Sequence, residues 1–438
     1  MLRAPLCIAR TVAEQRNMAS TDSRASQAVR SKASCAWEWL FAAAVGTCLL
    51  LLSNLIVPPA AVPFPGHGQR FAAMAQDPLA FTGEFPQRIL WPLLAWLFAQ
   101  IGIGTVAFSS LCNGALLAVV FWFTRRRCGS ILAALLVAAA IAASGTVLVY
   151  KPMMCFSDTL NLLLLVLLIH FADRAKVFWP LVVLTAFSHE LVFFFTPWLV
   201  YLRVQNGGRL WPEVGLWGVS VGIYGTFRIV LKVMDLTGPY DAAYYFKNAI
   251  WVPWALPVIW MLWGFVVLVE FGPLLIGMFF AGRRGELAKP SGMGGRWWPW
   301  LYFPSLLALM LLAYDVMRFA PLVFPPVLLG LVALVRSHGG CGKVAALVAV
   351  QVACYLWLHP IASEQGGRHF TEVSQLVLAK IHLLATRTPG DAWTFTMVLL
   401  EQFWRYALLA AGALVAFVLV GRWLAGRRYD SGEPLEHH

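Results

Sequence analysis

Charged residues are scarce in this chain. Asp, Glu, Lys and Arg make up 12% of its 438 residues, whereas soluble globular domains carry roughly 25%. Hydrophobic residues reach 60%, and the mean hydropathy is +0.71. The polar surface that a water-soluble domain needs is therefore missing. This excludes a soluble globular protein and indicates an integral membrane protein whose apolar surface faces lipid.

Cysteine motifs are also lacking. The eight cysteines form no CxxC pair and no zinc-ligand spacing, so a redox motif or a structural zinc site is not indicated. Cys112 and Cys354 lie in apolar stretches, where we expect reduced packing residues. The formal net charge is +12, but the basic residues are scattered between apolar segments. This distribution fits the positive-inside rule, and we expect no nucleic-acid partner.

Long apolar runs predict a polytopic helical bundle, because a helix crosses the hydrocarbon core with about 20 apolar residues. The segment 88–101 is short and amphipathic, and we expect an interfacial or re-entrant helix there. Counting it as a span would put Arg125, Arg126 and Arg127 outside. The pattern then predicts about twelve spans: 36–56, 105–123, 130–150, 159–172, 177–188, 191–202, 214–233, 252–280, 298–314, 319–335, 343–358 and 403–424.

The charge pattern also predicts the topology. Basic residues place both termini in the cytoplasm, and we expect a multi-pass protein of a bacterial inner (plasma) membrane. Residues 1–33 are expected to form a disordered cytoplasmic tail, 34–428 one transmembrane domain, and 429–438 a C-terminal tail with an affinity-tag remnant at Leu435 to His438. The two halves show no convincing similarity, which argues against a transporter built from repeats.

In this topology the ionisable residues gather at the outer ends of short helices. Such residues usually face one another or a water-filled cavity. Structural interpretations stay open for most of them: an interface anchor for Arg88, a helix N-cap for Asp158, and a structural pair across a tight turn for Asp315 and Arg318. The outer set is Arg88, Lys151, Asp158, His189, Glu190, Asp315 and Arg318, with Asp77 and Glu84 in the first outer loop.

Four short motifs in this order resemble the C-type superfamily (GT-C) of polyprenol-phosphate-dependent membrane glycosyltransferases, as a divergent bacterial member. The resemblance covers residues 36 to about 335 and lies more in layout than in identities. The motifs are Arg88-Ile-Leu-Trp-Pro92, Ser157-Asp158-Thr159-Leu160, Ser188-His189-Glu190 followed by Pro197, and the Asp315–Arg318 turn followed by Pro321.

This resemblance implies an all-α bundle whose extracytoplasmic first loop carries interfacial helices. It also implies transfer of a sugar from a polyprenyl-(pyro)phosphate donor to an envelope lipid, glycan or protein. Asp77 would be the general base, with Glu84 as the reserve, although the loop has no Asp-Asp or Asp-Glu motif. Arg88, Arg318 or Lys151 would stabilise the donor phosphate. Some relatives use a divalent cation such as Mg or Mn; the spacing of Asp77 and Glu84 specifies no metal site.

Other interpretations remain open. Tyr244 and Tyr245 lie in an outer loop and are candidates for contact with a sugar. A transporter or flippase of a lipid-linked or small substrate is the alternative function, and it is favoured by Glu270, which lies deep within a predicted span. A third possibility is an assembly factor that has kept the bundle without catalysis.

Overall fold

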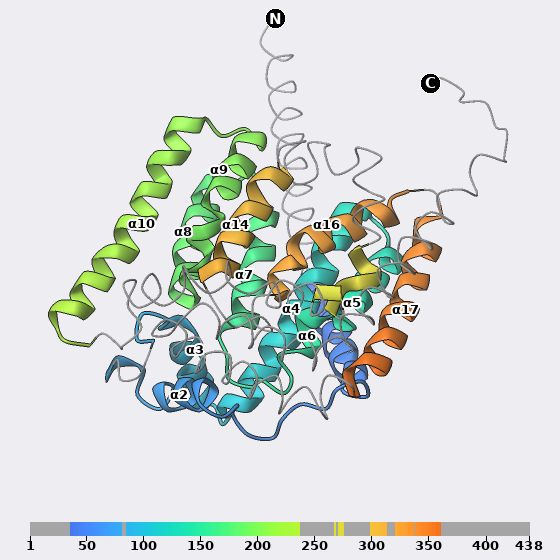
Figure 1. Ribbon diagram of the computed structural model, residues 1–438, viewed down its shortest axis with the longest axis horizontal. Helices are drawn as coiled ribbons and strands as arrows, with labels where there is room; N and C mark the ends of the chain where they lie inside the picture. Colours follow the sequence, from blue (N-terminus) through green and yellow to red (C-terminus); the bar gives the residue numbers. More distant parts are fainter. Residues whose placement is uncertain are drawn as a thin grey trace, which may run out of the picture.

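The computed structural model describes residues 36–80, 85–236, 267–268, 270–275, 298–312, 320–337 and 339–360. Every regular element in these ranges is a helix, which confirms the all-α prediction (Figure 1). The tails 1–33 and 429–438, the span 403–424 and most of the span 252–280 lie outside the described residues. The count of twelve spans stays a prediction.

The described helices follow the predicted apolar segments closely. The first runs over Ala36–Ser53. The others are α2 (His67–Met74), η1 (Pro78–Ala80), α3 (Leu90–Ala99), α4 (Thr105–Cys128), α5 (Ile131–Ala142), α6 (Gly145–Leu148), α7 (Asp158–His170), α8 (Ala175–Ser188), η2 (Glu190–Phe195), α9 (Thr196–Gln205), α10 (Leu210–Val233), α14 (Trp298–Leu312), η4 (Ala320–Val323), α16 (Phe324–Val335) and α17 (Gly340–Pro360).

Among the described residues, three helices are long and apolar enough to cross a membrane: Ala36–Ser53, α4 and α10. The first and the last are only 17% buried over their most apolar windows. Their outward side chains include Leu51 at 60% and Ile229 at 64% exposure. Large apolar surfaces of this kind are unfavourable in water, so these two helices support a location in lipid.

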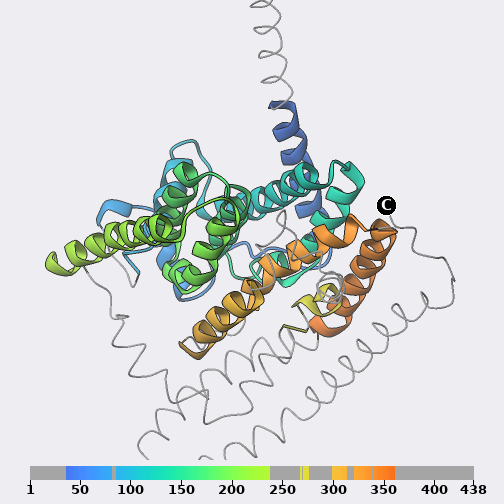
Figure 2. The same ribbon diagram turned by 90° about the horizontal axis from the view of Figure 1, so that it is seen from above.

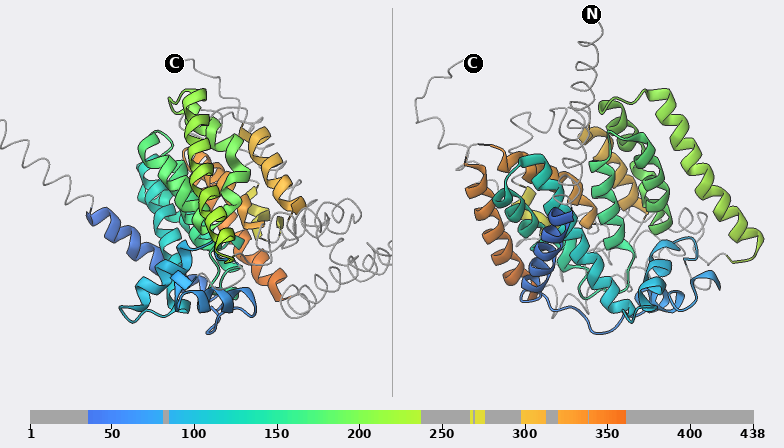
Figure 3. Two further views of the ribbon diagram at one scale, coloured as in Figure 1. Left: turned by 90° about the vertical axis from the view of Figure 1, so that its left-hand side faces the viewer. Right: turned by 180° about the vertical axis from the view of Figure 1, so that it is seen from behind.

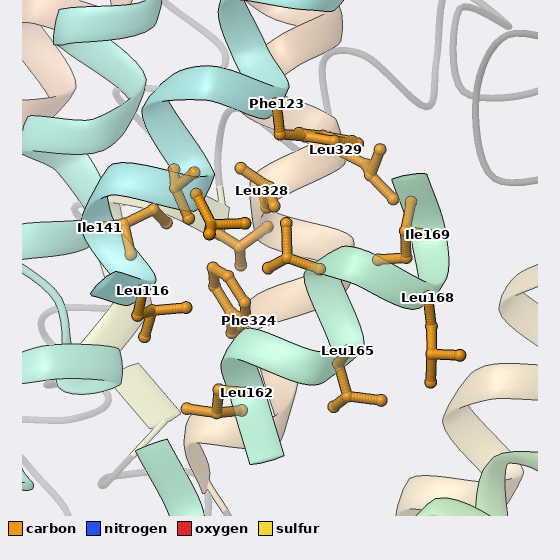
Figure 4. Packing of buried hydrophobic residues seen from close by; sticks show 14 of the residues in the cluster. Leu116, Phe123, Ile141, Leu162, Leu165, Leu168, Ile169, Phe324, Leu328 and Leu329 are labelled. Carbon is orange, nitrogen blue, oxygen red and sulfur yellow. The ribbon is translucent and has the colours of Figure 1, made fainter. Parts of the chain in front are cut away.

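The core of the bundle lies where α4, α5, α7 and α16 meet. Figure 4 shows Leu116 and Phe123 of α4, Leu162 and Leu165 of α7, and Phe324 of α16 directed toward one another. All five side chains are essentially inaccessible. Burying a side chain of this size stabilises a protein by about 1.5–3 kcal/mol relative to leaving it exposed to water. Between helices in lipid, close packing supplies the attraction instead.

The N-terminal helix Ala36–Ser53 packs along the outside of α4 (Figure 3). A Cβ at Gly46 would lie 2.5 Å from the carbonyl oxygen of Gly114, so only glycine allows this approach of the two backbones. Nearer the end that is predicted to face the cytoplasm, Trp39 stacks on Trp122 with ring centroids 4.4 Å apart. Small residues at a contact are typical of helix pairs in membranes.

The end of α4 carries the basic cluster Arg125 to Arg127, and Gly129 stops the helix in the left-handed conformation (φ 70°). At the same end Arg203 of α9 binds Glu213 of α10 through two hydrogen bonds of 2.7 and 3.1 Å. Trp179 of α8 also donates to Glu213, at 2.6 Å. This buried pair joins three helices on the side predicted to face the cytoplasm.

The opposite end is covered by the short helices α2 and α3 (Figure 1). Helix α3 has 10 residues and is about 15 Å long, half of the roughly 30 Å hydrocarbon core. It fits the predicted interfacial or re-entrant helix over 88–101. Seen from above, α10 runs outward past α8, while α14, α16 and α17 line another side of the bundle (Figure 2).

Candidate functional site

The site begins at a break between two short helices. Helix α8 ends at Ser188, and His189 is extended (φ −161°, ψ 124°) before the chain turns into η2. The backbone N–H of Leu191 donates to Nδ1 of His189 at 3.4 Å, which caps η2. Pro197 then opens α9, as expected for proline in a first helical turn. The break therefore presents His189 and Glu190 side by side.

Arg88 reaches this break from the start of α3. Its Nε donates to Oε2 of Glu190 at 2.9 Å, and its Nη2 donates to Oε1 at 2.8 Å. This is the two-bond fork in which arginine holds a carboxylate most firmly. The Arg88 side chain is 5% exposed and the Glu190 side chain 23%. The ring of Phe85 lies under the guanidinium, 4.4 Å from its Cζ.

Asp158 completes a chain of charged groups. It is the first residue of α7, where the helix dipole favours a carboxylate. The N-cap itself is Ser157, whose side chain makes no capping bond. Nε2 of His189 lies 3.8 Å from Oδ1 of Asp158, and Nδ1 lies 3.6 Å from Oε2 of Glu190. His189 thus stands between two carboxylates, within 4 Å of each.

The electrostatics of the break favour an ionised Glu190. Burial opposes the charge, but the charges of Arg88 and His189 and the hydrogen bonds from Arg88 outweigh it, so the pKa of Glu190 falls below its ordinary value. A carboxylate held charged in this way keeps its arginine partner fixed in position. We define Arg88, Asp158, His189 and Glu190 as the outer charge cluster.

Two residues of α10, Tyr224 and Arg228, lie beside the outer charge cluster. The sequence analysis did not place them there. Tyr224 is buried at 7% exposure and packs against the rings of Phe187 and Phe193, with centroids 5.8 and 5.4 Å away. Arg228 follows one turn later, and both Glu190 and Arg88 act electrostatically on the Tyr224 hydroxyl. The spacing of four residues, continuing a buried stripe from Glu213 and Ser220, is the sequence signal that points to them.

Arg228 differs from Arg88 in its pairing. No ion pair among the described residues involves Arg228, whereas the fork of Arg88 is occupied by Glu190. Arg228 is half-buried on the face of α10 that meets α8. Arg88 is therefore held in place by Glu190, and Arg228 is a second cation beside the outer charge cluster.

Two other predicted residues lie at the same end of the bundle. Asp77 is exposed in the turn between α2 and η1. Lys151 is inaccessible to solvent, and its Nζ donates to Oδ1 of Asn54 at 2.7 Å. Burial lowers the pKa of Lys151 to about 7. Within the described part of the chain, no hydrogen bond or ion pair joins Lys151 to the outer charge cluster, so its role at a phosphate stays a prediction.

Five predicted site residues lie outside the described residues, and their roles remain predictions. They are Glu84, Tyr244, Tyr245, Asp315 and Arg318. Within the described ranges, no three His, Cys, Asp or Glu side chains are grouped so as to hold a metal ion. The divalent cation implied by the resemblance stays a prediction.

An anion can bind between Arg88 of the outer charge cluster and the neighbouring Arg228, and a proton can pass between the imidazole of His189 and the two carboxylates beside it. Comparison with known protein families, with characterised proteins and with solved structures gave no match. The function is consequently inferred from the chemistry of the cluster and its place in the bundle.

Proposed function

We propose that the protein is a membrane glycosyltransferase that moves a sugar from a polyprenyl-(pyro)phosphate donor to an acceptor at the extracytoplasmic face. The outer charge cluster is the observation that supports it. Four ionisable residues from the segment before α3, the start of α7 and the α8–η2 break meet at one end of a helical bundle. Such groups are costly near lipid and are retained for function.

The donor chemistry suits this place. Its isoprenoid tail stays in the bilayer between helices, and its phosphate lies at the membrane surface. In the transfer step the bond between the sugar C1 and the phosphate oxygen breaks, and the phosphate leaves with the electron pair. The acceptor hydroxyl oxygen forms the new bond to C1, and its proton passes to a carboxylate acting as general base.

The residues divide these tasks. Arg228, which has no carboxylate partner among the described residues, contacts the donor phosphate and stabilises the charge that grows on it. Arg88, fixed by Glu190, supplies a second positive charge with little freedom to move. Asp77 is the proposed base, because it is the exposed carboxylate of the first outer loop.

Binding of the lipid phosphate is tested separately from transfer. Protein in lipid nanodiscs is titrated with undecaprenyl phosphate and with undecaprenol, and the bound lipid is counted by native mass spectrometry. We expect preference for the phosphate. Arg228→Met should weaken phosphate binding about tenfold, the equivalent of 1.4 kcal/mol, and leave undecaprenol binding unchanged. Lys232→Met, which removes an exposed cation one turn further along α10, is the matched control.

Transfer is tested with a panel of undecaprenyl-phosphate-linked sugars and an envelope extract as acceptor. Release of undecaprenyl phosphate is measured, because this product forms whichever acceptor is used. Asp77→Asn should stop release while leaving lipid binding and folding intact. Full release by Asp77→Asn would refute the role of Asp77, and equal binding of phosphate and alcohol would refute the donor class.

A transporter or flippase remains the second candidate. One observation favours it: Glu270 places a carboxyl group in the interior of the bundle, away from the outer charge cluster. A transporter would move a labelled substrate across proteoliposomes, whereas the proposed transferase would release undecaprenyl phosphate without such transport.

A further inference from the structure

The carboxyl group of Glu270 is buried, and no described residue forms a hydrogen bond with it. Glu270 lies in the helical residues 270–275 and is 2% exposed. Within the described part of the chain, neither Oε1 nor Oε2 has a hydrogen-bond partner. Glu213, the other fully buried glutamate of the described residues, is different because it binds Arg203.

The neighbours of this carboxyl leave space for it but do not neutralise it. A Cβ at Gly145 would lie 2.4 Å from both Cγ and Oε2 of Glu270, so glycine at the start of α6 makes room for the side chain. Gln351 of α17 donates to the backbone carbonyl of Glu270 at 3.0 Å and not to its carboxyl group. Ser144 and Thr146, on either side of Gly145, bond to each other.

Charged groups are absent from the surroundings of Glu270 in the described part of the chain. Burial is the one influence on its carboxyl that these residues exert. The titratable group facing it is the phenol of Tyr355, one turn beyond Gln351 on α17. Tyr355 is uncharged at neutral pH and packs with Val57 and Leu148.

Burying an ionised carboxylate without a partner in an apolar medium is far more unfavourable than burying a neutral polar group. A buried acid without a counter-charge therefore takes up a proton. Since no described residue is a partner of this carboxyl group, a proton is the ligand that its position calls for.

We propose that Glu270 forms a proton-binding site inside the helical bundle and carries a proton at neutral pH. This site is separate from the outer charge cluster, and the inference does not rest on the proposed glycosyltransferase activity. It applies equally to a transferase and to a proton-coupled transporter.

Infrared spectroscopy of the full chain in nanodiscs tests the site without requiring a reagent to enter the bundle. The C=O stretch of a protonated carboxylic acid is distinct from the bands of a carboxylate. At pH 7 we expect this stretch in the parent protein and its loss in Glu270→Gln. Glu213→Gln is the control: its carboxylate is paired with Arg203, so that variant should retain the acid band. Circular dichroism and thermal unfolding show whether each variant is folded.

Two further readings complete the test. Transfer to D₂O should shift the band to lower frequency in the folded protein, which shows that the proton exchanges, and raising the pH should remove the band reversibly. A band that is equally strong in the parent and in Glu270→Gln would overturn the proposal. A band that survives D₂O and alkaline pH unchanged would overturn it too. Loss of the band on addition of Na⁺ or K⁺ at constant pH would assign the site to a metal cation instead.

Discussion

Removal of one partner from the Arg88–Glu190 pair should destabilise the bundle strongly. Both hydrogen bonds of the pair are short, at 2.8 and 2.9 Å, and the Arg88 side chain is 5% exposed. Breaking a buried ion pair by truncating one side costs about 3–5 kcal/mol, because the other charge stays buried and unpaired. Glu190 is 23% exposed, so water can reach part of the carboxylate. We therefore expect about 3 kcal/mol, the lower end of that range.

The change is made as Arg88→Met, Glu190→Met and the double variant, and thermal unfolding is followed in one detergent. About 3 kcal/mol corresponds to a fall in Tm of roughly 3 °C for Arg88→Met, because the unfolding entropy scales with the 438 residues of the chain. The double variant should recover most of this loss, because no unpaired charge remains. Arg174→Met is the control: Arg174 is 65% exposed beside an exposed Asp173, so its Tm should change by less than the error.

The expected coupling between Arg88 and Glu190 is wrong if the stability losses of the two single variants simply add in the double variant. Additive effects would mean that Arg88 and Glu190 do not depend on each other in the folded state. The outer charge cluster would then lose its central contact, and Arg88 would serve as an independent interface anchor.

Three other changes test separate parts of the structure. The pKa of Lys151 is lowered from 10.5 to about 7. Between these pH values the unfolded chain binds more protons than the folded chain, so the free energy of unfolding should rise with pH. Lys151→Met should flatten this rise, as measured by thermal unfolding at a series of pH values. Gly46→Leu meets the carbonyl oxygen of Gly114 and should cost about 1–3 kcal/mol by overpacking; an unchanged Tm would contradict the close helix contact. Gly145→Ala should cost a similar amount because its Cβ meets Glu270, and adding Glu270→Ala should restore part of the loss, whereas two additive losses would argue against the contact.

The helices were largely predictable because apolar length marks them directly. The predicted span 105–123 lies in α4, and 214–233 lies in α10. The span 130–150 was predicted as one segment, but the structure breaks it. Helix α5 ends at Ala142, and Ser144 then caps α6 by accepting a hydrogen bond from the backbone N–H of Thr146. A single capping serine within an apolar run gives too weak a signal to show such a break.

The outer charge cluster was predictable only as a set of residues on one face. The topology placed Arg88, Asp158 and Glu190 at one end, but the pairing of Arg88 with Glu190 spans 102 positions and depends on how α3 packs against α8. Hydropathy alone did not place Arg228 at the site, because an isolated charge in a long apolar helix does not show which neighbouring helix its side chain faces. Its position beside the cluster follows from the face that α10 turns toward α8.

A structure of the protein with undecaprenyl phosphate in a lipid nanodisc tests the central claim most directly. The proposed function predicts the phosphate at the outer charge cluster, within contact distance of Arg228 and beside the Arg88–Glu190 pair, with the isoprenoid tail along the outer helices. A lipid phosphate bound elsewhere, with no density near Arg228 or Arg88, would contradict it.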